Sequence, residues 1–377
     1  MEGKNMVTLC AVGDIAAFYR DPESAFEYVG PLLRGADITF AQNERHYSQR
    51  KNIVPKGVAT ELTSPKRAEA LKLGGFDVIS FASNHCMDLG ADVMMETVNV
   101  LRNLGFNVIG AGRNIEEARR PVIIERQGTK VGFLAYASVI RPGYNAGPDT
   151  AGCAPMRART RYHQIDYQPG TPPQIITTPN KADLQALIKN IKKLRTQVDL
   201  LALSLHWGVH FYHAAIAMYQ KEVAHAAIDA GADIILGHHP HQLKGIEVYN
   251  GKPIFYSMGN FIFDRPPKEL IRRRQESAHL TNLMDLYGWK PDLEWKFYSW
   301  PPESRKSMIV RCYIVDNKIQ KVCFLPVLIN QNAQPRVVPP EDKDFNDYFQ
   351  YIKEITESQK LETEFTIEGN DIVVSLT

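Results

Sequence analysis

The chain has 377 residues, of which 44% are hydrophobic and 23% charged, and both values are ordinary for a soluble globular protein. Its 44 basic and 42 acidic side chains give a net charge of +2, which lacks the basic excess typical of nucleic-acid-binding proteins. The five cysteines are scattered and form no C-x-x-C pair, so we expect reduced thiols in a cytoplasmic protein. No apolar run reaches the roughly 18 residues of a membrane span, so no membrane-spanning segment is expected.

Segments typical of strands alternate with segments typical of helices along most of the chain. Strands are predicted at residues 6–14, 37–44, 76–85, 106–112, 129–138, 198–208 and 232–239. Helices are predicted at residues 64–75, 90–105, 181–197 and 219–231. This alternation predicts an α/β fold with a largely buried sheet. The Asn250-Gly251 pair adds an antiparallel hairpin within residues 245–264.

Two long segments interrupt this alternation of strands and helices. Residues 141–179 are rich in Pro, Gly, Arg and Tyr, and residues 265–307 contain several prolines, three tryptophans and the run Arg272, Arg273 and Arg274. Loops of this length are usually functional, so we expect lids over a site. The alternative is a surface for a partner or a homo-oligomer, because Trp, Tyr and Arg are enriched at interfaces.

Polar side chains with ligand chemistry recur at the ends of the predicted strands. They are Asp14, Glu44, Asn84, His85, His206, His238, His239 and His241. Taken singly, each has a structural explanation, such as a helix cap, a turn, a core histidine or an exposed loop. Because the carboxyl ends of parallel strands meet in one crevice, we expect the side chains to converge there. Mixed carboxylate and imidazole groups suit Mn, Fe or Zn better than calcium.

The stretches "AVGDI", "ADITFAQNE", "FDVISFASNHCMDLG", "LSLHWGVHF", "GADIILGHHPH" and "IFYSMGNFIFD" resemble the CapA family of poly-gamma-glutamate capsule biosynthesis proteins. That family is similar in fold to the calcineurin-like metallophosphoesterases. The resemblance covers residues 6–264 and implies a four-layer α/β/β/α sandwich with two mixed sheets and long lid loops. In this interpretation residues 1–264 form the main domain with an insertion at 141–179, residues 265–307 form a lid or interface, and residues 308–377 complete the same domain.

The resemblance also implies roles for individual residues. One or two divalent ions (Mn, Fe or Zn) would be held by Asp14, Glu44, Asn84, His206, His239 and His241. The catalytic residues would be His85, as the proton donor, and Asp88, which orients it. Substrate-binding candidates on the rim are His210, His238, Asn260 and Arg141. Four positions depart from the pattern. Ala16 stands where metallophosphoesterases often have a second histidine ligand, and the Glu44 segment replaces a bridging aspartate. Gln42 stands where the family has asparagine, and His210 stands where many CapA relatives have glutamate.

Two functions remain open at this stage. The first is a metal-dependent hydrolase that uses a metal-activated water to cleave a phosphoester or an amide-type bond. Its substrate would be anionic, either a small molecule or a peptide-like, glutamyl-containing chain. The second is a non-catalytic component of poly-gamma-glutamate or capsule polymer biosynthesis, with a structural or vestigial metal site. The chain has no serine nucleophile elbow and no P-loop, so the sequence does not favour those chemistries.

Overall fold

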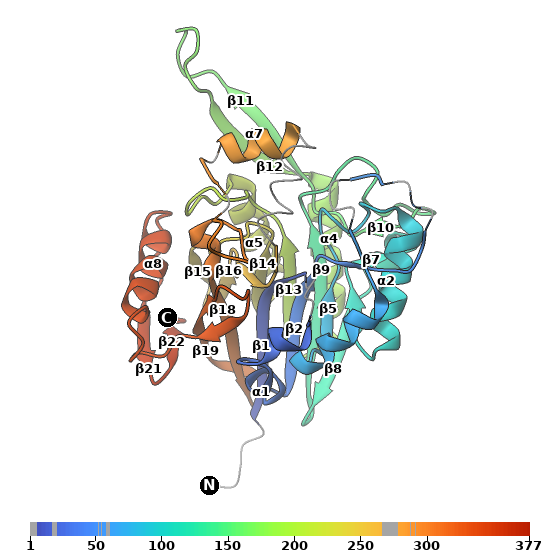
Figure 1. The fold of residues 1–377 in the computed structure, drawn as a ribbon, viewed down its shortest axis with the longest axis vertical. Coiled ribbons are helices and arrows are strands. Elements are labelled where there is room, and N and C mark those ends of the chain that lie inside the picture. The colour runs from blue at the N-terminus through green and yellow to red at the C-terminus, as the bar shows by residue number, and fades with distance from the viewer. Residues whose placement is uncertain are drawn as a thin grey trace.

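Two mixed β-sheets lie face to face in this protein, with helices on their outer sides (Figure 1). The structure is a computed structural model, and it describes residues 6–16, 21–51, 53, 55–57, 61–265, 278–286, 288–290 and 292–377. Among these residues, no helix is both long enough and apolar enough to cross a membrane.

The first sheet contains ten strands within the described residues. They are β1 (Met6–Ile15), β2 (Ile38–Asn43), β5 (Val78–Ser80), β6 (Asn107–Ile109), β17 (Asn260–Ile262), β18 (Lys306–Val315), β19 (Lys318–Ile329), β20 (Pro335–Val337), β21 (Phe365–Glu368) and β22 (Asp371–Val374). Their order is β21-β22-β19-β18-β1-β2-β5-β6, with β17 beside β1 and β20 beside β19. Strand β1 is parallel to β2 and β17 but antiparallel to β18, so the sheet is mixed.

The second sheet contains six strands in the described part of the chain. They are β8 (Val122–Arg126), β9 (Thr129–Ala137), β13 (Leu200–His206), β14 (Ile234–His238), β15 (Ile246–Tyr249) and β16 (Lys252–Phe255). The order is β15-β16-β14-β13-β9-β8, with parallel pairs in the middle and antiparallel pairs at both edges. The predicted turn at Asn250-Gly251 joins β15 to β16, where Asn250 and Gly251 both adopt positive φ angles of 49° and 71°.

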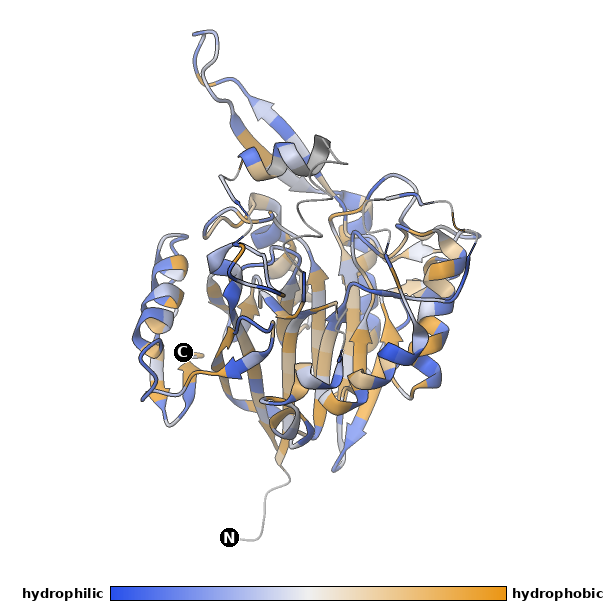
Figure 2. Cartoon of the chain, viewed as in Figure 1, coloured by the Kyte–Doolittle hydropathy of each residue, from blue (hydrophilic) through white to orange (hydrophobic). Residues whose placement is uncertain are grey.

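The side chains of β13 show how the layers are built. Leu200 and Ala202 face the core between the sheets, where Phe40 of β2 stacks on Phe133 of β9 at 6.0 Å. The alternate residues of β13 face a second core, which helices α4 (Lys181–Arg195) and α5 (Met218–Ala230) complete. This strict alternation follows from the two-residue period of a strand. Figure 2 shows the hydrophobic residues concentrated in the central strands.

Helices on the other side cover the ten-stranded sheet. Helices α1 (Gly30–Arg34) and α2 (Ala91–Asn103) contribute buried Leu33, Met94, Val98 and Leu101, which belong to the same connected hydrophobic cluster as the core between the sheets, and α8 (Phe345–Glu357) packs against β19. The predicted segment 64–75 is a 3-10 helix, η2 (Pro65–Gly74), that ends at Gly75 with φ 65°. The α/β/β/α sandwich with two mixed sheets is therefore confirmed.

The remaining elements are short or lie outside the sheets. They are η1 (Glu23–Phe26), β3 (His46–Tyr47), β4 (Leu62–Thr63), β7 (Ala111–Gly112), α3 (Ile115–Ala118), β10 (Gly152–Cys153), β11 (Ala158–His163), β12 (Gln174–Pro179), α7 (Ala278–Leu286) and η3 (Pro302–Arg305). Strands β11 and β12 pair as a hairpin that projects from the body of the molecule (Figure 1). Part of the segment predicted to be irregular thus has regular structure.

Candidate metal centre

The strand-end residues of the two sheets meet at one edge of the sandwich. Asp14 lies near the end of β1, Glu44 directly follows β2, and Asn84 follows β5, all in the ten-stranded sheet. His206 and His238 are the last residues of β13 and β14 in the six-stranded sheet, where they are register partners. The expected convergence therefore takes place, although it requires two sheets rather than one.

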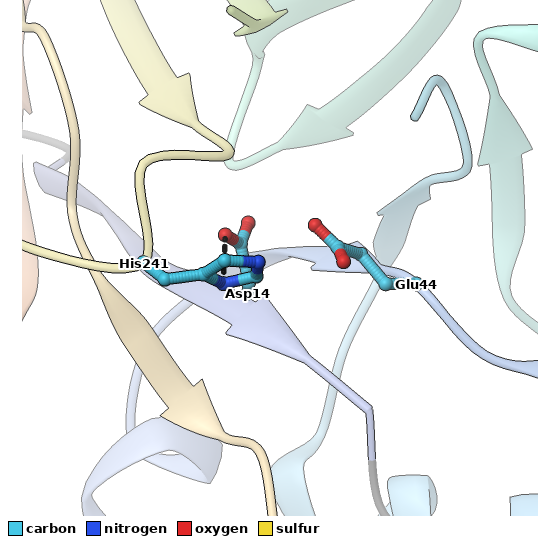
Figure 3. Close-up of side chains that lie close together, drawn as sticks. All are labelled: Asp14, Glu44 and His241. Atoms are coloured by element: carbon cyan, nitrogen blue, oxygen red, sulfur yellow. Dashed lines mark ion pairs between the residues drawn. The ribbon is translucent and has the colours of Figure 1, made fainter. Parts of the chain in front are cut away.

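Asp14, Glu44 and His241 bring three potential ligand atoms close together. One ligand atom from each of the three side chains lies within 4.8 Å of the other two, and all three side chains are buried. Figure 3 shows the Glu44 carboxylate facing Asp14 and His241, which come from a different strand and from the loop after β14. His241 Nδ1 lies 3.8 Å from Asp14 Oδ2 and 2.8 Å from Asn260 Oδ1.

The other predicted ligands surround this group. His206 Nε2 lies 2.8 Å from Asn84 Oδ1, 3.2 Å from His239 Nδ1 and 3.5 Å from Glu44 Oε1. The backbone N–H of His239 donates to Asp14 Oδ2 at 3.1 Å. The structure thus brings together all six residues that the family resemblance implies as metal ligands.

The electrostatics of this cluster are those of a site that needs a cation. Burial, and then the charge of Asp14, raises the pKa of Glu44 well above its usual value. Neither carboxylate oxygen of Glu44 has a hydrogen-bond partner among the described residues. Buried carboxylates without partners are costly, and a divalent ion would offset that cost. The residues present therefore fit a metal ion.

The imidazoles of the cluster are held in the form that binds metal. Burial is the largest cause that lowers the pKa values of His206, His239 and His241 well below the ordinary value, and neighbouring imidazoles act in the same direction. Neutral imidazole is the form that can bind a metal. The Nδ1 atom of His206 also lacks a hydrogen-bond partner among the described residues.

A chain of three side chains lies beside the cluster. His85 Nδ1 lies 2.7 Å from Asp88 Oδ2, and the Tyr144 hydroxyl donates to Asp88 Oδ1 at 2.8 Å. Burial and the Asp88 carboxylate raise the pKa of Tyr144, so its hydroxyl remains a donor at neutral pH. On the other side, the Asn84 amide lies 3.1 Å from His85 Nε2 and so links this chain to the ligands. Sequence reasoning paired His85 with Asp88 but did not assign Tyr144 to Asp88.

The predicted rim residues occupy different positions. The His210 ring lies 3.8 Å from that of His239 between centroids, and His238 Nδ1 lies 3.0 Å from Asp14 Oδ1. Asn260 is the register partner of Asp14 across the β1–β17 pair. Arg141 lies farther out: its carbonyl accepts from the Tyr144 N–H at 3.0 Å. Within the described residues, no hydrogen bond or ion pair links the Arg141 side chain to the cluster.

Aromatic rings from the segment 265–307 wall the cluster on one side. The Trp300 ring lies 4.6 Å from that of His241, and the Arg265 guanidinium lies 4.2 Å from the Trp300 ring. Phe211 contacts both His241 and Trp300, with centroids 5.7 and 5.6 Å away. Arg272, Arg273 and Arg274 lie outside the described residues.

Two of the candidate ligand residues have unusual backbone conformations. His239 and His241 adopt φ angles of 96° and 57°, in the left-handed backbone region that residues other than glycine rarely adopt. Such conformations persist where the surrounding structure holds them, and they cluster at functional sites. The residue between them, Pro240, accepts the Phe211 N–H at 3.2 Å and so helps to fix this turn.

Two mixed sheets between helices, with carboxylates and imidazoles gathered at one set of strand ends, define an α/β/β/α protein with a candidate metal site. The chain belongs to the family described as bacterial capsule synthesis protein PGA_cap, whose model matches residues 7–265. It is 31% identical over 245 residues to the PGA biosynthesis protein CapA of Bacillus subtilis, a match that covers 64% of this chain and 57% of the relative. The chain thus spans little more than half the length of that relative.

Solved structures with a related arrangement are more distant. A phosphatase from Mycoplasma pneumoniae is 13% identical with a TM-score of 0.48, and the likeness covers 93% of this chain and 100% of that chain. The calcineurin-like phosphoesterase YfkN from Bacillus subtilis is 12% identical with a TM-score of 0.40, covering 95% of this chain and 100% of that chain. Likenesses at this level carry no conclusion about activity.

Proposed function

We propose that this protein is a metal-dependent hydrolase that acts on an anionic, glutamyl-containing substrate in capsule polymer metabolism. The observation that carries the proposal is the His85–Asp88–Tyr144 chain beside a buried ligand cluster. A purely structural metal site would need the ligands, but it would not need an oriented, partly exposed histidine next to them. The side chain of His85 is 15% exposed, whereas that of Asp88 is fully buried.

Six residues would hold one or two divalent ions of the Mn, Fe or Zn type: Asp14, Glu44, Asn84, His206, His239 and His241. When bound, such an ion supplies a water of lowered pKa and polarises an oxygen of the substrate. Glu44 and Asp14 then neutralise the charge of the ion, and the neutral imidazoles offer their lone pairs to it. The aromatic wall around Trp300 excludes water from the same side.

His85 is the residue that moves a proton in this proposal. Asp88 accepts the hydrogen on Nδ1, which fixes the ring and leaves Nε2 as the nitrogen that faces the cluster. In the protonated form, His85 donates its Nε2 proton to the leaving group as the scissile bond breaks. The Asp88 carboxylate stabilises the imidazolium, and the Tyr144 hydroxyl keeps that carboxylate in place.

The test compares His85→Ala with a matched control, His163→Ala, on the exposed β11 strand. Protein supplied with Mn, Fe or Zn is assayed against phosphoesters and γ-glutamyl peptides, and its metal content is measured. We expect His85→Ala to lose turnover by about 10²–10⁴-fold while keeping its metal, and His163→Ala to behave as wild type. Loss of metal in His85→Ala would instead make His85 a ligand.

One observation favours a second candidate function: the Bacillus subtilis relative is named only as a biosynthesis protein. The chain would then be a non-catalytic component of poly-gamma-glutamate or capsule assembly. Metal-loaded wild-type protein that hydrolyses no member of either substrate class would support this alternative and contradict the hydrolase.

A further inference from the structure

The projecting β11–β12 hairpin lacks the support that a two-stranded sheet usually needs. A hairpin alone is only marginally stable in water, and further strands or a packed helix normally stabilise it. At its base β12 contacts α5, whereas β11 pairs with no strand except β12 in the described part of the chain. The outer edge of β11 therefore presents a row of backbone N–H and C=O groups, which is a template for pairing with another strand.

The two faces of the hairpin differ in chemistry. Tyr162 and Ile175 are register partners on one face, and their side chains are 69% and 59% exposed. Successive residues of a strand point to opposite faces, so Arg159 and Arg161 lie together on the other face, where both are exposed. Within the described residues, neither guanidinium has an ion-pair partner. Strand β11 is thus an open edge with one apolar face and one basic face.

Strand β21 is also an open edge, and its charged face is acidic. It is the last strand of the ten-stranded sheet and pairs only with β22 among the described strands. Phe365 and Ile367 share one face, and Ile367 is 46% exposed. The other face carries exposed Glu368 and exposed Glu364, whose carbonyl extends the pairing with β22 by one hydrogen bond of 3.0 Å. Glu368 is paired with Lys321 at 2.6 Å, whereas Glu364 has no ion pair among the described residues.

The two open edges match each other in pattern and in charge. Each alternates apolar and charged side chains with the two-residue period of a strand, and the charges are opposite in sign. Opposite charges directly across two paired strands are stabilising, and like charges are destabilising. The two edges do not meet within one chain, because the hairpin projects from one end of the molecule and β21 lies well away from it (Figure 1). The matching edge is therefore on a second copy of the chain.

Two other occupants of the hairpin fit less well. A second hairpin would bring Arg159 and Arg161 of both copies together, and these like charges would repel. A bilayer would need apolar side chains at the tip, but Asp166 stands there between Ile165 and Tyr167.

We propose that β11 of one copy pairs edge to edge with β21 of a second copy and so joins two chains by strand addition. Arg159 and Arg161 then lie across from the acidic face of β21, and the apolar faces of the two strands adjoin. Because the two edges are different surfaces, a closed dimer makes this contact twice, once through the hairpin of each copy. No residue of the candidate metal centre takes part, so the contact does not depend on the proposed function.

The experiment exchanges the charges of the two edges in the full-length protein. The hairpin variant is Arg159→Glu/Arg161→Glu. The edge variant is Glu364→Arg/Thr366→Arg, which leaves the ion pair of β21 with β19 intact. Each variant alone places like charges across the contact, but an equal mixture of the two restores opposite charges at both contacts of the dimer.

The matched control is Lys181→Glu/Lys189→Glu on α4, which changes two exposed cations and the net charge by the same amount as the hairpin variant. Sedimentation velocity over a series of protein concentrations measures association. We expect the control to associate as wild type does, each charge variant alone to associate about 10–100-fold more weakly, and the mixture to recover to within about 3-fold of wild type. Melting temperatures equal to that of the control show that the variants are folded.

Three results would overturn the proposal. The first is wild-type protein that remains monomeric at every concentration, and the second is association that neither charge variant weakens. The third is a loss in both variants that their mixture does not restore, because the two edges would then not contact each other. Monomeric wild-type protein that binds phosphatidylglycerol vesicles through Arg159 and Arg161 would assign the hairpin to a bilayer instead.

Discussion

His238 Nδ1 lies 3.0 Å from Asp14 Oδ1, and this contact joins the end of β14 in one sheet to the end of β1 in the other. Both side chains are fully buried, so the pair is shielded from solvent screening. The candidate metal centre therefore depends on how the two sheets are stacked, and not only on the individual strands.

Without metal, Glu44→Gln should be more stable than wild type, and with metal it should be less stable than wild type. Without metal, Glu44→Gln should raise the melting temperature, because burial and Asp14 already disfavour the charged form of Glu44. With metal at 100 times its Kd, wild type should gain about 2.7 kcal/mol of stability, and the variant should gain much less. Thermal melts with and without Mn, together with elemental analysis, measure both effects.

The exposed Glu116→Gln is the control for this experiment and should follow wild type in both conditions. Normal metal content in Glu44→Gln would show that Glu44 is not a ligand.

Tyr144→Phe should reduce kcat by roughly 10-fold and leave metal content unchanged, because outer hydrogen-bond partners typically contribute 10–100-fold. The hydroxyl donates to Asp88, so its loss frees the carboxylate that orients His85. Steady-state kinetics separate kcat from KM, and Tyr162→Phe on the exposed hairpin is the control. A change confined to KM would place Tyr144 in substrate binding instead.

Lys244 should make the stability of the protein depend on pH. Its side chain is buried, its Nζ donates to the Tyr212 carbonyl, and burial lowers its pKa to about 7. The unfolded chain keeps the ordinary value of 10.5, so between pH 7 and 10.5 the unfolded state binds more protons and stability rises with pH. Below pH 7 both states are protonated, and the full penalty of burying the charge remains.

Lys244→Met should therefore be more stable than wild type at pH 6.5, with an advantage that shrinks by up to about 1.4 kcal/mol per pH unit above pH 7. Urea unfolding at pH 6.5 and 9.5 measures this difference, with the exposed Lys189→Met as a control. An advantage that is constant with pH would mean that Lys244 stays charged in the folded protein at both pH values, as it is in the unfolded chain.

The β11–β12 hairpin should be dispensable for the metal centre. Its base contacts α5, where Thr177 Oγ1 accepts the Tyr219 N–H at 3.1 Å, whereas Tyr167 near its tip is 95% exposed. Shortening residues 164–173 to a two-residue Asn-Gly turn should leave metal content and turnover within about two-fold of wild type, because surface loops tolerate such changes. A ten-fold loss of turnover would instead support the hairpin as a lid.

The sequence predicted the convergence of these polar side chains because strand ends are locally recognisable. Polar residues such as Asp14 and His206 directly follow apolar runs, and the rule that strand ends meet at one edge does not depend on which sheet each strand joins. The division into two sheets came only from the family resemblance. Local periodicity does not specify which strands pair, because that depends on contacts between distant segments.

Other features of the site had no local signal. Asn260 lies beside Asp14 because β17, at the end of the segment 245–264 where the sequence predicts antiparallel strands, instead pairs in parallel with β1. Tyr144 and Trp289 were expected only as aromatic residues of lids, and their contacts with Asp88 and Phe211 arise from loop packing.

The left-handed backbone at His239 and His241 limits how this protein can be made more heat-resistant. At such positions glycine is less strained than histidine, by about 1–3 kcal/mol for each residue. A library selected for thermal survival alone would therefore enrich glycine at both positions. The surviving clones would fold more stably but would lack two imidazoles of the candidate metal centre. Selection for stability and selection for function would therefore favour different residues in this turn.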